Sequence, residues 1–143
     1  MKLVDLFERF DNSKSYFHGG VLGKTKGRPI FFTDDFNHAS DFSENDESFL
    51  VQEVKLSFKK SANIDDLNKA IKDTGAVDDD VKSGYVDDES DFLFAPKVLA
   101  ELKSHGFDSF IGKGVKDSQM IMEYVAFDIS QVKVIKVTKV YEP

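Results

Sequence analysis

The sequence predicts a single α+β domain in which short helices accompany largely antiparallel sheets. The 143 residues are 41% hydrophobic and include 14 phenylalanines, which is enough apolar material for one core. Segments with strand periodicity and segments with helical periodicity follow one another without the strict alternation of a parallel α/β protein. No internal repeat or low-complexity tract divides the sequence, so we expect residues 1–143 to form one domain.

Five elements are expected in the first 60 residues. Apolar residues recur at helical spacing at the start of the chain and again after a capping aspartate, which is Asp34 or Asp35. Runs of aromatic and apolar residues bounded by glycine, proline or polar residues indicate strands. In order, the sequence predicts a helix over residues 2–10, strands over 15–18 and 30–33, a helix to about residue 42, and a strand over 49–58.

Two further helices carry clear signals at their ends. Asn63 with Asp66 three residues later has the pattern of a capping box, and the helix that it opens should stop at Gly75. Pro96 suits the first turn of a second helix, which should end at Gly106.

Three strands are expected near the end of the sequence, over residues 107–111, 120–128 and 132–141. We interpret the Gly-Lys-Gly segment at 112–114 as a turn between the first two. Residues 78–91 hold seven carboxylates among few apolar residues, which is typical of a solvated surface segment. Their order is not that of a calcium-binding loop.

The composition excludes several classes of function. Without cysteine there is no disulfide, thiolate nucleophile or Cys-ligated zinc, and His18, His38 and His105 are too scattered to indicate a metal site. Neither a signal peptide nor a membrane-spanning apolar run is found, so we expect a cytoplasmic protein. The formal net charge of -7 disfavours nucleic acid as a partner.

One glutamate stands in an otherwise apolar strand. Side chains alternate along a strand, so Ile121, Glu123, Val125 and Phe127 should share one face. A carboxylate in apolar surroundings must be protonated, paired or turned toward a cavity that a ligand can fill. The alternative is that the strand ends near Glu123 and the carboxylate reaches water.

A histidine at the end of the first expected strand is a second candidate. His18 is followed by Gly19 and Gly20, which allow a ligand to approach the backbone closely. A histidine that is hydrogen-bonded in the core or lies on the surface explains the same residues. Phe31 and Phe42 are likewise explained as core residues when each is considered alone.

Three segments occur in a suggestive order: YFHGG at 16–20, PIFFTDDFNHASDF at 29–42 and MEYVAFDISQV at 122–132. Together they resemble the ADP-ribosyltransferase superfamily. The resemblance is closest to its His-Tyr-Glu branch, which includes poly(ADP-ribose) polymerases, diphtheria-toxin-like enzymes and small bacterial and phage transferases. It implies a fold of two apposed, mostly antiparallel sheets around an NAD cleft, with flanking helices.

The resemblance also implies a role for each matching residue. Glu123 would stabilise the cationic ribose that forms when the nicotinamide-ribose bond of NAD breaks. His18 would bind the adenosine ribose, and the Gly19 backbone would hold the nicotinamide carboxamide. Phe31 and Phe42 would sandwich the nicotinamide ring.

The sequence departs from the family pattern at several positions. Phe31 and Phe42 stand where the family usually has tyrosine, Gly20 replaces a common serine or threonine, and Ala39 lacks a hydroxyl found in many relatives. We therefore expect these positions to line the cofactor site with modest affinity for NAD. Ile121 replaces the Glu or Gln of the arginine-modifying branch, so transfer to a guanidinium is not expected.

The function that these residues predict is mono-ADP-ribosyl transfer from NAD, the substrate, to a protein acceptor. One alternative keeps the fold as an NAD-binding pseudoenzyme. Another is an acidic interaction or inhibitor protein, such as a phage inhibitor of host defence, whose segment 78–91 would occupy the basic site of a partner. Hydrolysis of NAD and modification of a nucleic acid share the same first step, and the negative charge makes the latter the least favoured.

Overall fold

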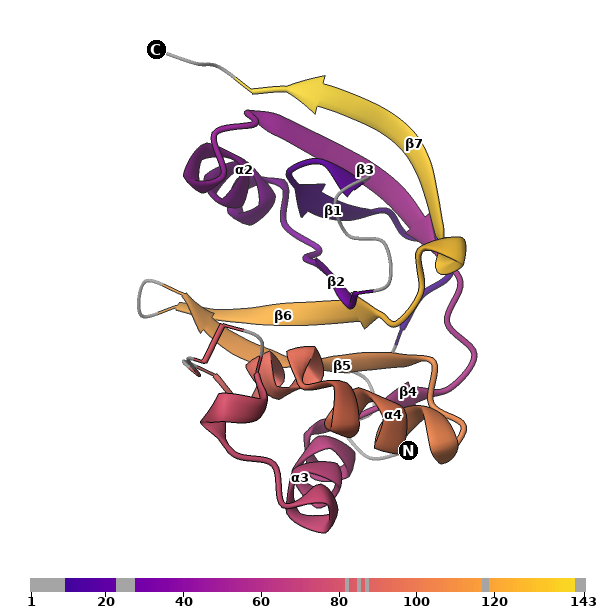
Figure 1. The fold of residues 1–143 in the computed structure, drawn as a ribbon. Coiled ribbons are helices and arrows are strands. Elements are labelled where there is room, and N and C mark those ends of the chain that lie inside the picture. Colours follow the sequence, from indigo (N-terminus) through magenta and orange to yellow (C-terminus); the bar gives the residue numbers. More distant parts are fainter. Residues whose placement is uncertain are drawn as a thin grey trace.

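The structure is a computed structural model that describes residues 10–22, 28–81, 83, 84, 86, 88–116 and 119–140. Two sheets lie one above the other, and helices cover the outer side of the lower sheet (Figure 1). The mixed, mostly antiparallel α+β architecture agrees with the sequence prediction. The helix expected over residues 2–10 lies outside the described residues except for its last residue.

The first sheet has three antiparallel strands in the order β1-β3-β7. These strands are β1 (Tyr16–Gly19), β3 (Leu50–Leu56) and β7 (Val132–Lys139). The central strand β3 pairs with both neighbours, and a register shift between Glu53 and Val54 interrupts its ladder with β7. The sequence located all three strands to within a few residues.

The second sheet has four strands in the order β2-β6-β5-β4. They are β2 (Ile30–Phe32), β6 (Gln119–Ala126), β5 (Ser109–Lys116) and β4 (Ser61–Ala62). All of its pairs are antiparallel except that of β4 with β5. The sequence did not predict β4, which has only two residues and depends on its neighbour for its conformation.

The turn predicted at 112–114 is wrong, because β5 runs through these residues. A Cβ on Gly112 would lie only 2.5 Å from the ring of Phe110. A Cβ on Gly114 would lie 2.5 Å from a carboxylate oxygen of Glu123. The two glycines therefore make room within a strand for larger side chains, a role that glycine can have without a turn.

In the part of the chain that the structure describes, three α-helices flank the sheets, and side chains cap two of them. They are α2 (Phe36–Asn45), α3 (Ile64–Thr74) and α4 (Pro96–Ser104). Asp35 is the N-cap of α2, while Asn63 and Asp66 form the predicted capping box of α3. Helix α2 continues three residues beyond the predicted end, and α4 begins with the predicted proline.

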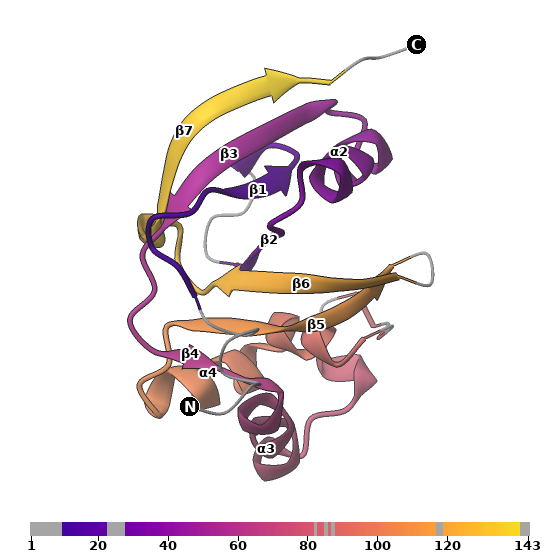
Figure 2. The same ribbon diagram turned by 180° about the vertical axis from the view of Figure 1, so that it is seen from behind.

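Sheet β2-β6-β5-β4 is covered on both faces, as the two opposite views show (Figures 1 and 2). On one face, Val125 and Phe127 join a core that includes residues of α3 and α4. On the other face, Tyr124 and Ala126 join a core between the two sheets. Strand β6 thus contributes alternate side chains to two cores. A strand that is buried on both faces needs apolar residues at nearly every position.

One short contact joins the sheets at the ends of β1 and β2. The backbone N–H groups of Phe17 and Thr33 each donate to the carbonyl of the other, at 2.8 and 2.9 Å. This bridge brings the His18 end of β1 beside the Phe31 end of β2. Among the described residues, no helix is long and apolar enough to cross a membrane.

Replacement of Asn63 tests the capping box. Asn63→Ala removes the side-chain acceptor for the N–H of Asp66, so we expect the free energy of unfolding to fall by about 1 kcal/mol. Chemical denaturation measures this change. The matched control is Asn68→Ala in the exposed middle of α3, where the same substitution should be neutral or slightly stabilising; equal losses in both variants would contradict the assignment.

Candidate active site

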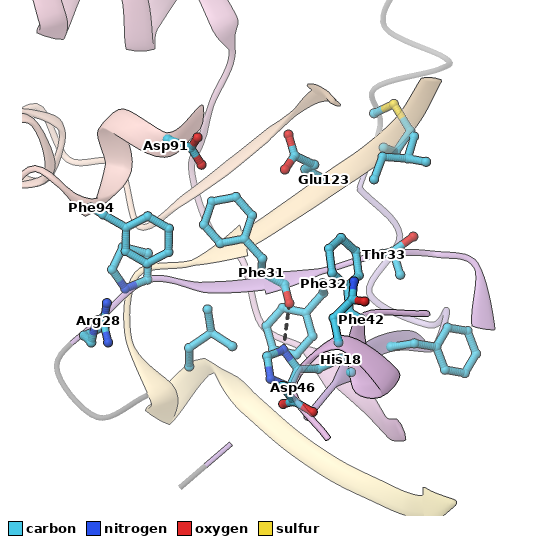
Figure 3. A pocket seen from close by; sticks show the side chains of 17 residues that line it. His18, Arg28, Phe31, Phe32, Thr33, Phe42, Asp46, Asp91, Phe94 and Glu123 are labelled. Carbon is cyan, nitrogen blue, oxygen red and sulfur yellow. Dashed lines mark hydrogen bonds between the residues drawn. The ribbon is translucent and has the colours of Figure 1, made fainter. Parts of the chain in front are cut away.

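A pocket of about 580 Å³ opens between the two sheets and the segment before α4 (Figure 3). Residues from β1, β2, α2 and β6 line it, together with Asp91 and Phe94 of the 3-10 helix η3 (Glu89–Phe94). Of the residues that the sequence singled out, His18, Gly19, Phe31, Phe42 and Glu123 lie in its wall. Four separate segments of the chain are therefore brought together at one site.

The register of β6 turns Glu123 toward the pocket. Phe31 of β2 pairs with Val125, so its side chain shares a sheet face with Glu123 two residues away. The hydroxyl of Ser90 donates a hydrogen bond to Glu123 Oε1 at 3.1 Å. Gly114 on β5 leaves the space that the carboxylate fills. The strand continues past this residue, so Glu123 is not at a solvated strand end.

The surroundings of Glu123 favour its protonated form. Burial and the nearby carboxylate of Asp88 raise the pKa of Glu123 to about 7. The hydrogen bond from Ser90 opposes this shift, and the charge of Asp91 adds to it. Glu123 therefore changes charge near neutral pH, where a small change in its surroundings alters its ionisation. Such perturbed groups in pockets are characteristic of functional sites.

His18 is fixed by one hydrogen bond at the end of β1. Its Nδ1 lies 2.9 Å from the carbonyl oxygen of Phe31, which is an acceptor, so Nδ1 carries the proton and donates. Burial lowers the pKa of His18, although the bond to Phe31 and the charge of Asp46 oppose this shift. In the neutral ring, Nε2 is then an acceptor that can take a hydrogen bond from a hydroxyl group.

The two expected stacking residues lie on different elements. Phe31 on β2 stacks on Phe94 with ring centroids 5.3 Å apart and an interplanar angle of 11°. Phe42 on α2 has 43% of its surface exposed. In Figure 3, Phe94 lies on one side of Phe31 and Phe42 on the other, with Glu123 above the space between. One face of Phe31 is thus covered by the protein itself.

Gly20 and Ala39 are not among the residues that line this pocket. Gly20 has a φ of 119°, a conformation that serine and threonine rarely adopt, which accounts for glycine at this position. Ala39 is fully buried on α2, and its carbonyl oxygen would lie only 2.0 Å from a Cβ on Gly19. Helix α2 therefore packs directly on the backbone of β1.

Sequence reasoning missed several residues of the pocket and its wall. Asp88, Ser90, Asp91 and Phe94 come from the end of the acidic segment and the turn that follows. The prediction of a solvated surface is wrong there, because Ser90 is only 2% exposed and reaches Glu123. The sequence pattern that could have indicated a folded turn here is a capping box, Asp88 with Asp91, directly before the apolar run at 92–94.

Two charged residues of the pocket were also missed. Arg28, just before β2, places its guanidinium 5.6 Å from the ring centre of Phe94. Asp46, just after α2, lines the wall near His18. In the described part of the chain, no group of three or more His, Asp or Glu side chains is arranged to hold a metal ion.

Comparison with known proteins identifies the family. A family model described as the ADP-ribosyltransferase in polyvalent proteins matches residues 4–139, almost the whole chain. The chain belongs to this family. No curated protein and no solved structure matches it significantly.

Membership gives the site a chemical context. The family consists of ADP-ribosyltransferases, whose substrate is NAD, and the arrangement of two sheets with flanking helices is compatible with their fold. The resemblance inferred from three short segments is thereby supported at the level of the superfamily.

The buried state of Glu123 predicts a pH-dependent stability. Its pKa is about 7 in the folded chain against a reference value of 4.5, so the folded state binds the proton more tightly. Relative to Glu123→Gln, the wild-type free energy of unfolding should fall as pH rises from about 4.5 to about 7. The change should be on the order of 1 to 3 kcal/mol. Chemical denaturation of both proteins at several pH values measures this change. If the difference between their free energies of unfolding did not vary with pH, Glu123 would be an ordinary solvated carboxylate.

Proposed function

We propose that the protein is a mono-ADP-ribosyltransferase that cleaves the nicotinamide-ribose bond of NAD and transfers ADP-ribose to a protein acceptor. The observation that carries this proposal is the carboxylate of Glu123, held by Ser90 in a pocket whose wall also contains His18, Phe31 and Phe42. Membership in the ADP-ribosyltransferase family supports the same chemistry.

Glu123 acts on the charge that develops during the reaction. When the bond between C1 of the ribose and the nicotinamide nitrogen breaks, the electron pair leaves with nicotinamide and the ribose becomes an oxocarbenium ion. The ionised carboxylate stabilises that cation and accepts a hydrogen bond from a ribose hydroxyl. In the free protein burial raises the pKa of Glu123, and the charges of Asp88 and Asp91 add to this shift. The cationic nicotinamide ring of bound NAD favours the ionised form.

The backbone of β1 can hold the nicotinamide carboxamide. The N–H of Gly20 donates to the carbonyl of Leu50 on β3, and hydrogen-bonding direction alternates along a strand. The polar groups of Gly19 therefore face the opposite edge, the one at which Phe17 pairs with Thr33. That edge borders the pocket, and the ring of nicotinamide would lie between Phe31 and Phe42.

Arg28 is suited to the diphosphate of NAD. It is the only lysine or arginine among the described lining residues, whereas Asp46 and Asp91 supply negative charge. A diphosphate would be repelled by these carboxylates unless a cation stood near it. A guanidinium offers several N–H donors in the plane that phosphate oxygens prefer. Its guanidinium lies over the ring of Phe94, which also lines the pocket.

Glu123→Gln tests the proposal directly. The substitution keeps the size of the side chain but removes its charge, so labelling of a lysate protein from NAD labelled in its adenylate part should fall at least a hundredfold. Labelled acceptor is measured after gel separation. Thermal shifts with NAD should remain similar in both proteins, because binding does not need the charge that the reaction needs.

The outcomes separate the alternatives. Equal labelling by wild type and Glu123→Gln would contradict catalysis by this carboxylate. Release of nicotinamide without labelled protein would indicate hydrolysis, and binding of NAD with neither product would indicate a pseudoenzyme.

Arg28→Ala should weaken the use of NAD without abolishing the chemistry. Loss of a cation near the diphosphate should raise KM for NAD about tenfold, with a smaller effect on kcat. Initial rates of nicotinamide release over a range of NAD concentrations measure both constants. Arg28→Lys keeps the charge but not the planar set of donors, so its KM for NAD should lie between those of wild type and Arg28→Ala. An unchanged KM in Arg28→Ala would show that Arg28 does not bind NAD.

A further inference from the structure

Asp46 lines the pocket, and its charge acts on His18. Its Oδ1 accepts a hydrogen bond from the N–H of Ser48 at 2.9 Å, which fixes the side chain at the end of α2. Its Oδ2 packs against Gly20, and His18 Nε2 lies 3.7 Å from the point where a Cβ on Gly20 would stand. Figure 3 shows the carboxylate directly below the imidazole. The two groups thus flank one small region of the wall.

This pair has the chemistry to recognise a ribose diol. An ionised carboxylate only accepts hydrogen bonds, and a neutral histidine whose Nδ1 donates elsewhere also accepts through Nε2. Two adjacent acceptors match the two vicinal hydroxyl donors of a ribose ring. A phosphate on one of these hydroxyls would remove a donor and place about two negative charges next to Asp46.

The resemblance already implies that His18 binds the adenosine ribose of NAD. We propose that Asp46 borders this ribose and that its charge excludes dinucleotides with a 2′-phosphate. This inference rests on the proposed function, since it takes NAD as the ligand of the pocket. In dinucleotide-binding folds of other architecture, an acidic residue on the ribose 2′-hydroxyl likewise separates NAD from NADP.

The charges around the subsite support exclusion. Arg28, the one cation among the described lining residues, lies beside Phe94 and apart from Asp46 in Figure 3. Asp46 is therefore not neutralised by Arg28. Because burial lowers the pKa of His18, the imidazole is neutral at physiological pH and does not offset a phosphate either.

Asp46→Asn is a sharp test because it removes the charge while the amide oxygen retains the acceptor for Ser48. The ratio of kcat/KM for NAD to that for NADP is measured from nicotinamide release. We expect wild type to prefer NAD at least a hundredfold and Asp46→Asn to reduce this preference at least tenfold, mainly through a gain with NADP. Asp41→Asn, which removes one charge from the exposed face of α2, should leave the ratio unchanged.

Calorimetric titration with ADP-ribose and with 2′-phospho-ADP-ribose gives a second readout that does not require catalysis. We expect wild type to bind ADP-ribose more tightly than 2′-phospho-ADP-ribose and Asp46→Asn to reduce this difference in affinity. An unchanged ratio in Asp46→Asn, with normal turnover of NAD, would overturn the inference and leave the proposed function standing. If wild type releases no nicotinamide at all, the proposed function fails, and the titrations alone decide whether Asp46 discriminates between the two ligands.

Discussion

The burial of the Glu123 carboxylate on an otherwise apolar strand face is the constraint on which the site depends. Neighbouring elements accommodate it: Ser90 donates a hydrogen bond, Gly114 leaves the space, and the sheet holds the backbone in register. A carboxylate in such surroundings is costly to ionise, and Asp88 adds to the cost. A cation that forms close by attracts the ionised carboxylate and offsets these costs, which is how a buried acid can stabilise a transition state more than a ground state.

The architecture follows from this constraint. Strand β6 carries Glu123 between two cores, so its backbone is fixed by packing on both faces and the carboxylate is held on a rigid element. The bridge between Phe17 and Thr33 then sets β1 and β2 beside it, which places His18 and Phe31 in the same pocket wall. The pocket wall is thus divided between segments that lie far apart in sequence, while Glu123 stands on a strand that packs on both faces.

The sequence predicted features that depend on local pattern. The alternation of side chains along β6 indicated which sheet face carries Glu123, and Asn63 and Pro96 marked the starts of two helices. Both features are determined by interactions within a few residues of the chain. The roles of Gly114 and of the segment that contains Ser90 were missed, since they depend on what the fold brings opposite them. Composition alone describes residues 78–91 as solvated, yet contacts made across the chain turn the end of this segment inward.

A structure of the Glu123→Gln variant bound to NAD tests the central claim most directly, because the variant should bind the dinucleotide without consuming it. The measurement is the distance from the side-chain oxygen at position 123 to the hydroxyls of the nicotinamide ribose. We expect a hydrogen bond of about 2.7 to 3.2 Å, with the nicotinamide ring between Phe31 and Phe42. A dinucleotide bound elsewhere, or with its nicotinamide ribose remote from position 123, would contradict the account.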